Sequence, residues 1–363
     1  MRRPVRWPGG HGCDHGLRGT LLRHSFPFLA IVASFAACAG KSDAEFQTEI
    51  ASQIHQSIGV DLGDMVRAAH DLQSAAPSHA WDKVDPIAIS QMRDAWKRMR
   101  SAWENIEGAM SPMFPALNIA LDARYEDLLL GLGENGDQNP FDGRGVIGMH
   151  AVERILFAQS VRPEVIARES ILPGYRPPVY PSTDDEAIAF KTELLQRLVE
   201  DATTMETDWR PNDIDVGAAY LGLVDLMREQ QKKVNLAVTS EEESRYANIT
   251  MLDMRNNITG TQRSYELFRE WILSKAAAES SDQQIVTRLD DLGKTYEAYR
   301  KGDSLPDVPE GWSSANPSPA SLSTPFGILW QQIRESVDPA SHGSVVFEMN
   351  QIAALLGFPE VIE

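Results

Sequence analysis

A histidine and a glutamate stand three positions apart in the segment GVIGMHAVERILF, residues 145–157, among mostly apolar neighbours. At about 100° per residue, His150 and Glu153 lie on adjacent turns of one helix face. Glu153 falls inside the apolar arc of this helix, and His150 falls at the edge of that arc. We therefore expect both titratable side chains to face the interior of a helical bundle.

Acidic side chains on the two preceding helical segments could reach the same interior. Glu107 lies close to the apolar stripe of residues 86–110, whereas Glu104 lies further round toward solvent. Asp122 flanks the apolar stripe of residues 114–132. A buried carboxylate costs several kcal/mol unless it finds a partner, and neighbouring carboxylates raise one another's pKa. A bound cation would remove that cost.

Imidazole and carboxylate groups are ligands of transition metals, and helical bundles supply them from several helices, including pairs spaced i, i+3. The spacing therefore predicts a metal site at His150, Glu153 and Glu107, with Asp122 as a further ligand.

Each of these residues also has an ordinary structural explanation. A lone histidine near an apolar face is often a hydrogen-bonded core residue, and HxxE by itself is a weak pattern. An inward glutamate often pairs with an arginine, for which Arg100, Arg124 and Arg154 are candidates.

The charge of the chain excludes one class of partner. The 363 residues carry 34 basic and 52 acidic side chains, a net charge of −18. Without residues 1–37 the balance is 29 basic against 51 acidic, or −22. Such a surface repels nucleic acids and anionic lipid headgroups and attracts cations, so we expect no nucleic-acid partner.

The first forty residues have the pattern of a targeting segment. Basic residues precede FPFLAIVASFAACAG, an apolar stretch of about a dozen residues where a membrane span needs roughly 20. Small residues before Cys38 resemble a bacterial lipoprotein cleavage box. This pattern predicts a signal peptide at 1–37, lipidation of Cys38 and a linker at 38–43. The location would then be periplasmic and anchored to the cell envelope, at the outer membrane because no retention aspartate follows; an ordinary secretory signal is the alternative.

The remainder is predicted to be all-α. Apolar residues recur at spacings of three and four, and no strand-like alternation is evident. The expected helices are 43–58, 62–75, 86–110, 114–132, 144–160, 184–206, 215–238, 244–275, 280–300, 323–336 and 341–357. Gly- and Pro-rich residues at 173–185 would separate a first helical bundle at 44–172 from a second at 186–363.

Several motifs resemble those of one family. GMHAVERILF resembles the GxHxxE motif of imelysin-like proteins, in particular iron-uptake lipoproteins of the EfeO/EfeM type. Four further segments resemble family motifs in the same order: RSAWENIEGAM, ALDARYEDL, DVGAAYLGLVDLM and SEEESRYANITMLDMRNNITGTQ. Only about forty-five residues separate Cys38 from the first matching helix, so the resemblance is to the short form without a cupredoxin domain.

The resemblance implies two antiparallel four-helix bundles with a site in a cleft. It implies a metal, most often iron with zinc or copper possible, held by His150, Glu153, Glu107, Glu104 and Asp122. Matching motifs and helix periodicity suggest the cleft-lining residues Arg124, Arg245, Tyr246, Asp253 and Asn256. It further implies a role in iron uptake beside an inner-membrane permease and a peroxidase-like partner.

Two other functions stay open from the sequence. Some imelysin-like proteins are classed as metallopeptidases, but the H-E-x-x-H pattern of common zinc peptidases is absent here. Others are similar to alginate-binding proteins, for which the eight tryptophans could supply stacking surfaces. Trp96 and Trp103, however, fall in a predicted core stripe. We expect a binding protein and not an enzyme.

Overall fold

Helices, turns and loops make up the part of the chain that the structure describes. The computed structural model describes residues 40–81, 86–210, 213–300 and 302–359, and no strand occurs among them. The predicted all-α class is confirmed for these residues. The predicted signal peptide at 1–37 and Cys38 lie outside the described residues, as does the start of the 38–43 linker.

The helices in chain order are α1 (Asp43–Ala75), α2 (Pro86–Glu104), α3 (Glu107–Met110), α4 (Pro115–Asp122), α5 (Tyr125–Leu132), α6 (Gly148–Leu156), α7 (Pro163–Glu169), α8 (Asp184–Ala189), α9 (Leu195–Asp208), α10 (Val216–Leu236), α11 (Thr250–Leu273), α12 (Glu279–Ala298), α13 (Pro319–Leu322), α14 (Pro325–Val337) and α15 (Val345–Leu356). A π-helical turn at Phe190–Leu194 joins α8 to α9.

Helix α1 is one continuous helix where the sequence suggests two. It begins at a capping box, in which the Ser42 side chain accepts from the Glu45 N–H and Glu45 accepts from the Ser42 N–H. Its buried stripe runs through Ile54, Ile58 and Leu62 without interruption. The burial of this stripe outweighs the cost of placing Gly59 inside the helix, about 1 kcal/mol relative to alanine.

The predicted helix at 86–110 is broken, which separates α2 from α3. Helix α11 crosses the break so closely that a Cβ atom on Gly260 would lie 2.0 Å from the Asn105 carbonyl oxygen. The predicted helix at 114–132 is also broken, because Ala123 and Arg124 have extended backbone conformations. Asp122 is therefore the last residue of α4.

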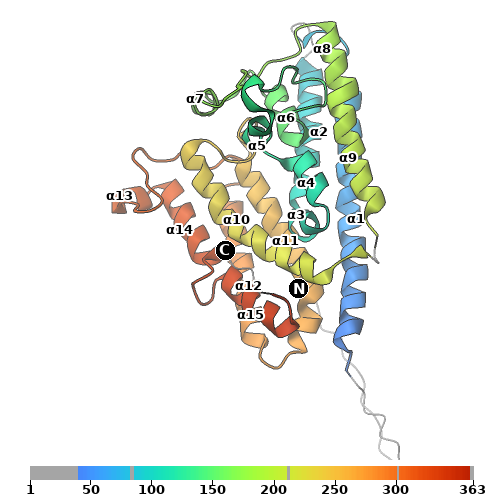
Figure 1. Cartoon of the computed structure of the whole chain (residues 1–363). Coiled ribbons are helices and arrows are strands. Elements are labelled where there is room, and N and C mark those ends of the chain that lie inside the picture. Colours follow the sequence, from blue (N-terminus) through green and yellow to red (C-terminus); the bar gives the residue numbers. More distant parts are fainter. Residues whose placement is uncertain (1–39, 82–85, 211–212, 301, 360–363) are drawn as a thin grey trace, which may run out of the picture. The chain divides into compact units, whose positions relative to one another are not determined.

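The helices of residues 42–363 pack in two neighbourhoods (Figure 1). Helix α1 packs most extensively on α2 and on α9. Helix α10 packs on α3, α11, α14 and α15, and α12 packs on α11 and α15. Helix α11 also contacts α1, α2 and α3, so it joins the two neighbourhoods.

The division into bundles at 44–172 and 186–363 stays a prediction; the contacts place residues 42–363 in one compact unit. None of the helices in the described residues combines the length and the apolar character that a membrane span requires.

Candidate functional site

Helix α6 brings His150 and Glu153 into the interior. The two residues are 2% and 0% exposed, and His150 Nδ1 lies 2.9 Å from Glu153 Oε2. Helix α6 begins at Gly148, whose φ is +83° and whose Cβ, if present, would lie 2.5 Å from the Ala120 carbonyl oxygen. Only glycine allows this close approach of α6 to α4. As a result, His150 Nε2 lies 3.3 Å from Asp122 Oδ1.

The second carboxylate oxygen of Glu153 is held by backbone. It accepts hydrogen bonds from the N–H groups of Tyr246 at 3.0 Å and Ala247 at 2.8 Å. These donors belong to the turn segment 240–249, which precedes α11. Glu153 therefore ties α6 to that segment.

Arg100 is the cation at the centre of the acidic residues. Its guanidinium is wholly buried and forms ion pairs with Glu104 and Asp122. It also lies 3.2 Å from Glu243 and 3.7 Å from Asp253. The prediction that Glu104 lies toward solvent is wrong, because the pairing with Arg100 holds this glutamate at 0% exposure.

Lys233 of α10 is a second buried cation. Its ammonium lies 2.9 Å from Glu243, 3.4 Å from Glu104 and 3.7 Å from Glu107. It also donates to the Asn257 side-chain oxygen at 2.7 Å, and the amide nitrogen of Asn257 donates to Glu104 at 2.6 Å. Lys233 thus bridges α10, α11 and the α2–α3 break.

Three of the carboxylates could bind one ion together. Glu104, Glu243 and Asp253 each offer a carboxylate oxygen, and these oxygens lie within 4.8 Å of one another. Neither carboxylate oxygen of Asp253 makes a hydrogen bond of normal geometry within the described part of the chain. A buried carboxylate without hydrogen bonds is costly even beside the Arg100 guanidinium, so these residues fit a bound cation. We call Glu104, Glu243 and Asp253 the acidic triad.

Negative charge is in excess around Arg100 and Lys233. Six buried or nearly buried carboxylates surround these two cations and His150: Glu104, Glu107, Asp122, Glu153, Glu243 and Asp253. We call these nine residues the buried cluster. Without a metal, protons must compensate the excess.

The pKa shifts follow this excess. Burial raises the pKa of Asp253 well above its usual range although Arg100 opposes the rise. Burial likewise raises the pKa of Glu107, with Lys233 opposing and Glu104 assisting. Burial would raise the pKa of Asp122 too, but the charges of Arg100 and His150 place it well below the usual range.

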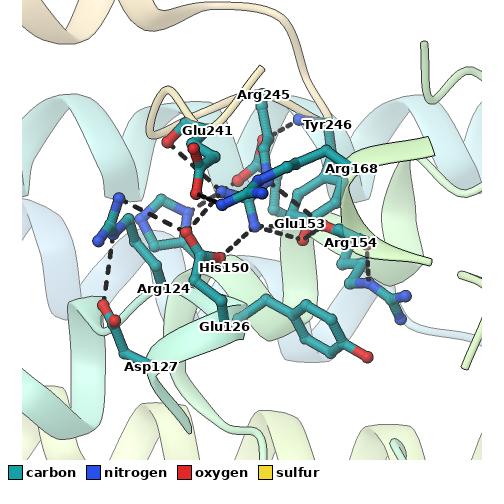
Figure 2. Close-up of polar contacts among 12 residues, drawn as sticks. Arg124, Glu126, Asp127, His150, Glu153, Arg154, Arg168, Glu241, Arg245 and Tyr246 are labelled. Carbon is teal, nitrogen blue, oxygen red and sulfur yellow. Dashed lines mark hydrogen bonds and ion pairs between the residues drawn. The ribbon is translucent and has the colours of Figure 1, made fainter. Parts of the chain in front are cut away.

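A second set of ion pairs lies beside the buried cluster (Figure 2). Arg245 contacts Glu126 and Glu169, and Glu169 also accepts from Arg154 at 3.2 Å and from the Tyr246 hydroxyl. These contacts connect α5, α6 and α7 to the turn segment 240–249.

Three consecutive glutamates in this turn segment pair with different cations. Glu241 lies 2.7 Å from Arg168 at the end of α7, and Glu242 pairs with Arg162 just before α7. Glu243 instead faces inward to Lys233 and Arg100. Ser240 and Asn248, with φ of 58° and 57°, flank this run. The turn segment 240–249 is therefore held by ion pairs to α7 and its N-terminal neighbour on one side and to Arg100 and Lys233 on the other.

The predicted site residues do not all meet at one point. Arg100 contacts Asp122, Glu104 and Asp253. His150 is connected to this group through Asp122, and Glu153 contacts His150. Glu107 is connected through Lys233 and Asn257.

The other predicted cleft residues lie outside the buried cluster. Arg124 pairs with Glu126 and Asp127 on α5, and the side-chain nitrogen of Asn256 has no hydrogen-bond partner among the described residues. Arg245 and Tyr246 belong to the neighbouring ion-pair set, although the Tyr246 backbone reaches Glu153.

The sequence of the chain matches a family model and a curated relative. A family model described as Imelysin, peptidase family M75, matches residues 61–320. The chain belongs to the imelysin family. A curated relative of this imelysin, named Efem/EfeO family lipoprotein, comes from Staphylococcus haemolyticus (strain JCSC1435) and is 29% identical over 111 residues. That match covers 31% of this chain and 37% of the relative, so it spans little more than a third of the relative's length.

Two solved structures share the imelysin fold. An imelysin-like protein from Psychrobacter arcticum 273-4 superposes with a TM-score of 0.59 at 13% identity, over 89% of this chain and 99% of that one. A protein from Parabacteroides distasonis ATCC 8503, provisionally named an iron-regulated protein A precursor, gives a TM-score of 0.57 at 12% identity, over 88% and 97% of the two chains. These likenesses establish a common fold.

Proposed function

We propose that this imelysin is an exported, lipid-anchored metal-binding protein of an iron-uptake system. Its metal would be held in the buried cluster, by the acidic triad of Glu104, Glu243 and Asp253. The observation that carries the proposal is the excess of carboxylates around Arg100 and Lys233, with both oxygens of Asp253 lacking a normal hydrogen bond. A bound cation would replace the protons that otherwise compensate this excess.

The choice of iron has separate support. Carboxylate oxygens favour hard cations, and imidazole extends the range to iron, zinc and copper. In the cluster the imidazole of His150 is joined to the acidic triad through Asp122 and Arg100. The name of the Parabacteroides distasonis relative, an iron-regulated protein precursor, points the same way. By the family resemblance, an inner-membrane permease and a peroxidase-like protein would be the partners.

A binding role suits the cluster better than catalysis. The side chains of the acidic triad and of His150 are between 0% and 14% exposed, so they admit an ion more readily than a peptide. Attachment at Cys38 would keep the protein in the cell envelope, as the relative named a lipoprotein suggests.

Metal analysis of the purified protein tests this function. We expect about one tightly held ion per chain after loading with ferrous, ferric, zinc, copper or manganese ions in turn, measured by mass spectrometry of the metals. The Glu243→Gln/Asp253→Asn double variant should lose at least a hundredfold in affinity. Glu348→Gln is the matched control, because Glu348 is also buried but bonds to Ser281 and Gly343 far along the chain.

The His150→Ala/Glu153→Ala variant tests the HxxE prediction in the same assay, and we expect it to lose the metal too. Wild-type protein that retains no metal would overturn the proposal. Metal-dependent cleavage of a peptide library, lost in the same variants, would instead indicate a peptidase.

A further inference from the structure

An open cavity of about 810 Å³ lies between α10 and α14, apart from the buried cluster. Its lining comes from α10, from α14 with the two residues after it, and from Ser314 and Ala315. This volume falls within the range of small-molecule sites, about 300–1,000 Å³. Nothing in the proposed function uses it.

One wall of the cavity is ordered by a tryptophan. Trp330 is 4% exposed, and its indole N–H donates to the Asn235 side-chain oxygen at 2.7 Å. The Arg334 guanidinium lies over the Trp330 ring, with Cζ 5.3 Å from the ring centre. This cation–π contact holds the guanidinium against a fixed surface of the cavity.

Two of the cations that line the cavity have no ion-pair partner. Lys232 and Arg334 each lack a carboxylate within 4.0 Å among the described residues, whereas Arg228 pairs with Asp225 at 3.1 Å. Both cations are exposed side chains, and the same lining carries three carboxylates, Asp225, Glu229 and Asp338.

The acidic residues of the lining are already engaged. Asp225 is held by Arg228, and Asp338 accepts from the Ala340 N–H at 2.9 Å and the Ser341 hydroxyl at 3.0 Å. Glu229 lies one helical turn before Lys233 on α10; burial raises the pKa of Glu229, and the charges of Lys233 and Lys232 oppose that rise. The lining therefore carries three cations and three carboxylates, and Lys232 and Arg334 are the cations without an ion pair within 4.0 Å among the described residues.

We propose that this cavity binds a small organic anion that carries two or more carboxylates, with Lys232 and Arg334 as its partners. A guanidinium binds a carboxylate through two parallel hydrogen bonds, and an ammonium adds a point charge. Because the two cations come from different helices, an anion with two separated charged groups fits them better than one inorganic ion. The apolar side chains of Trp330, Leu236 and Val337 would contact its carbon skeleton.

The site has a consequence for metal uptake that rests on the proposed function. Glu229 lines the cavity, and Lys233, one turn further along α10, contacts Glu104 and Glu243. A polycarboxylate that carries a metal ion into the cavity would therefore arrive about one helical turn from the buried cluster.

Titration of the metal-free protein with citrate tests the anion site. In metal-depleted buffer we expect saturable binding of one citrate per chain by calorimetry, with a change in tryptophan fluorescence from Trp330. The Lys232→Ala/Arg334→Ala variant should bind at least tenfold more weakly. The control Lys294→Ala/Arg300→Ala removes the same charge from exposed side chains elsewhere and should bind as wild type.

Three outcomes would overturn the inference. One is equal citrate affinity in the Lys232→Ala/Arg334→Ala variant, with circular dichroism confirming the fold. Another is sulfate or inorganic phosphate binding as tightly as citrate at the same ionic strength. The third is a uronate oligosaccharide displacing citrate at a hundredfold lower concentration, which would indicate a polysaccharide site. Because no metal is present, failure here leaves metal binding untouched, and failure of metal binding leaves this result untouched.

Discussion

The His150 imidazole is held in its charged form by two carboxylates. Burial lowers its pKa, but the contacts with the Asp122 and Glu153 carboxylates raise that pKa to about 9. Because this value exceeds the unfolded-state pKa near 6.5, the stabilisation is fully present below pH 6.5 and is lost as the pH rises through 9. The shift corresponds to about 3 kcal/mol.

We therefore expect the metal-free protein to lose about 3 kcal/mol of unfolding free energy between pH 6 and pH 10 through His150 alone. Urea denaturation across this range measures the loss. The His150→Gln variant cannot be protonated, so its stability should fall less over the same range. Parallel curves for the two proteins would show that His150 does not carry a raised pKa.

Some of the buried cluster could be predicted from the sequence and some could not. His150 and Glu153 sit on one strongly apolar helix, so their burial follows from periodicity, and their burial is confirmed. Lys233 leaves a weaker signal, a single lysine within the apolar stripe of α10. Glu243 leaves none, because it stands in a turn with two other glutamates, and no periodicity distinguishes the inward one.

Close helix packing at glycines determines where the elements break. The α2–α3 break follows from the contact of Gly260 with Asn105, which joins residues more than 150 positions apart. A local pattern cannot reveal such a contact, so the sequence predicts one helix over 86–110. By contrast, a Cβ atom on Gly59 would meet no neighbouring atom within 4 Å, and α1 continues through this residue.

Opposite effects of one substitution at two glycines test this explanation. Gly260→Ala should destabilise the protein by about 2 kcal/mol or more, because the new Cβ would overlap the Asn105 carbonyl. Gly59→Ala should stabilise it by about 0.5–1 kcal/mol, because alanine is the better helix former and meets no atom within 4 Å. Chemical denaturation of both variants measures the difference, and equal signs would contradict the packing argument.

The buried cluster helps to hold together the part of the chain that the structure describes. Its members come from α2, α3, α4, α6, α10, α11 and the turn segment 240–249, so a metal bound there would connect most of the fold. The all-α class follows from sequence periodicity and is confirmed for the residues that the structure describes. The way in which α11 joins the two neighbourhoods depends on contacts between distant residues, which no local pattern contains.

A ligand that binds only the folded state stabilises it by mass action. Metal at 100 times its dissociation constant should therefore raise the free energy of unfolding by about 2.7 kcal/mol. Thermal denaturation with increasing metal concentration measures this rise. The Glu243→Gln/Asp253→Asn variant should show no comparable rise, and an equal rise in both proteins would place the metal elsewhere.

The three adjacent glutamates at 241–243 make the length of their segment as critical as its composition. Each acid has its own cation, two beside α7 and one in the interior. Inserting or deleting one residue within 240–243 would move these acids out of register with their cations and turn the inward carboxylate away from Lys233. Natural variants of this protein should therefore differ in length across the long connection at 302–318 and keep this short turn at a constant number of residues.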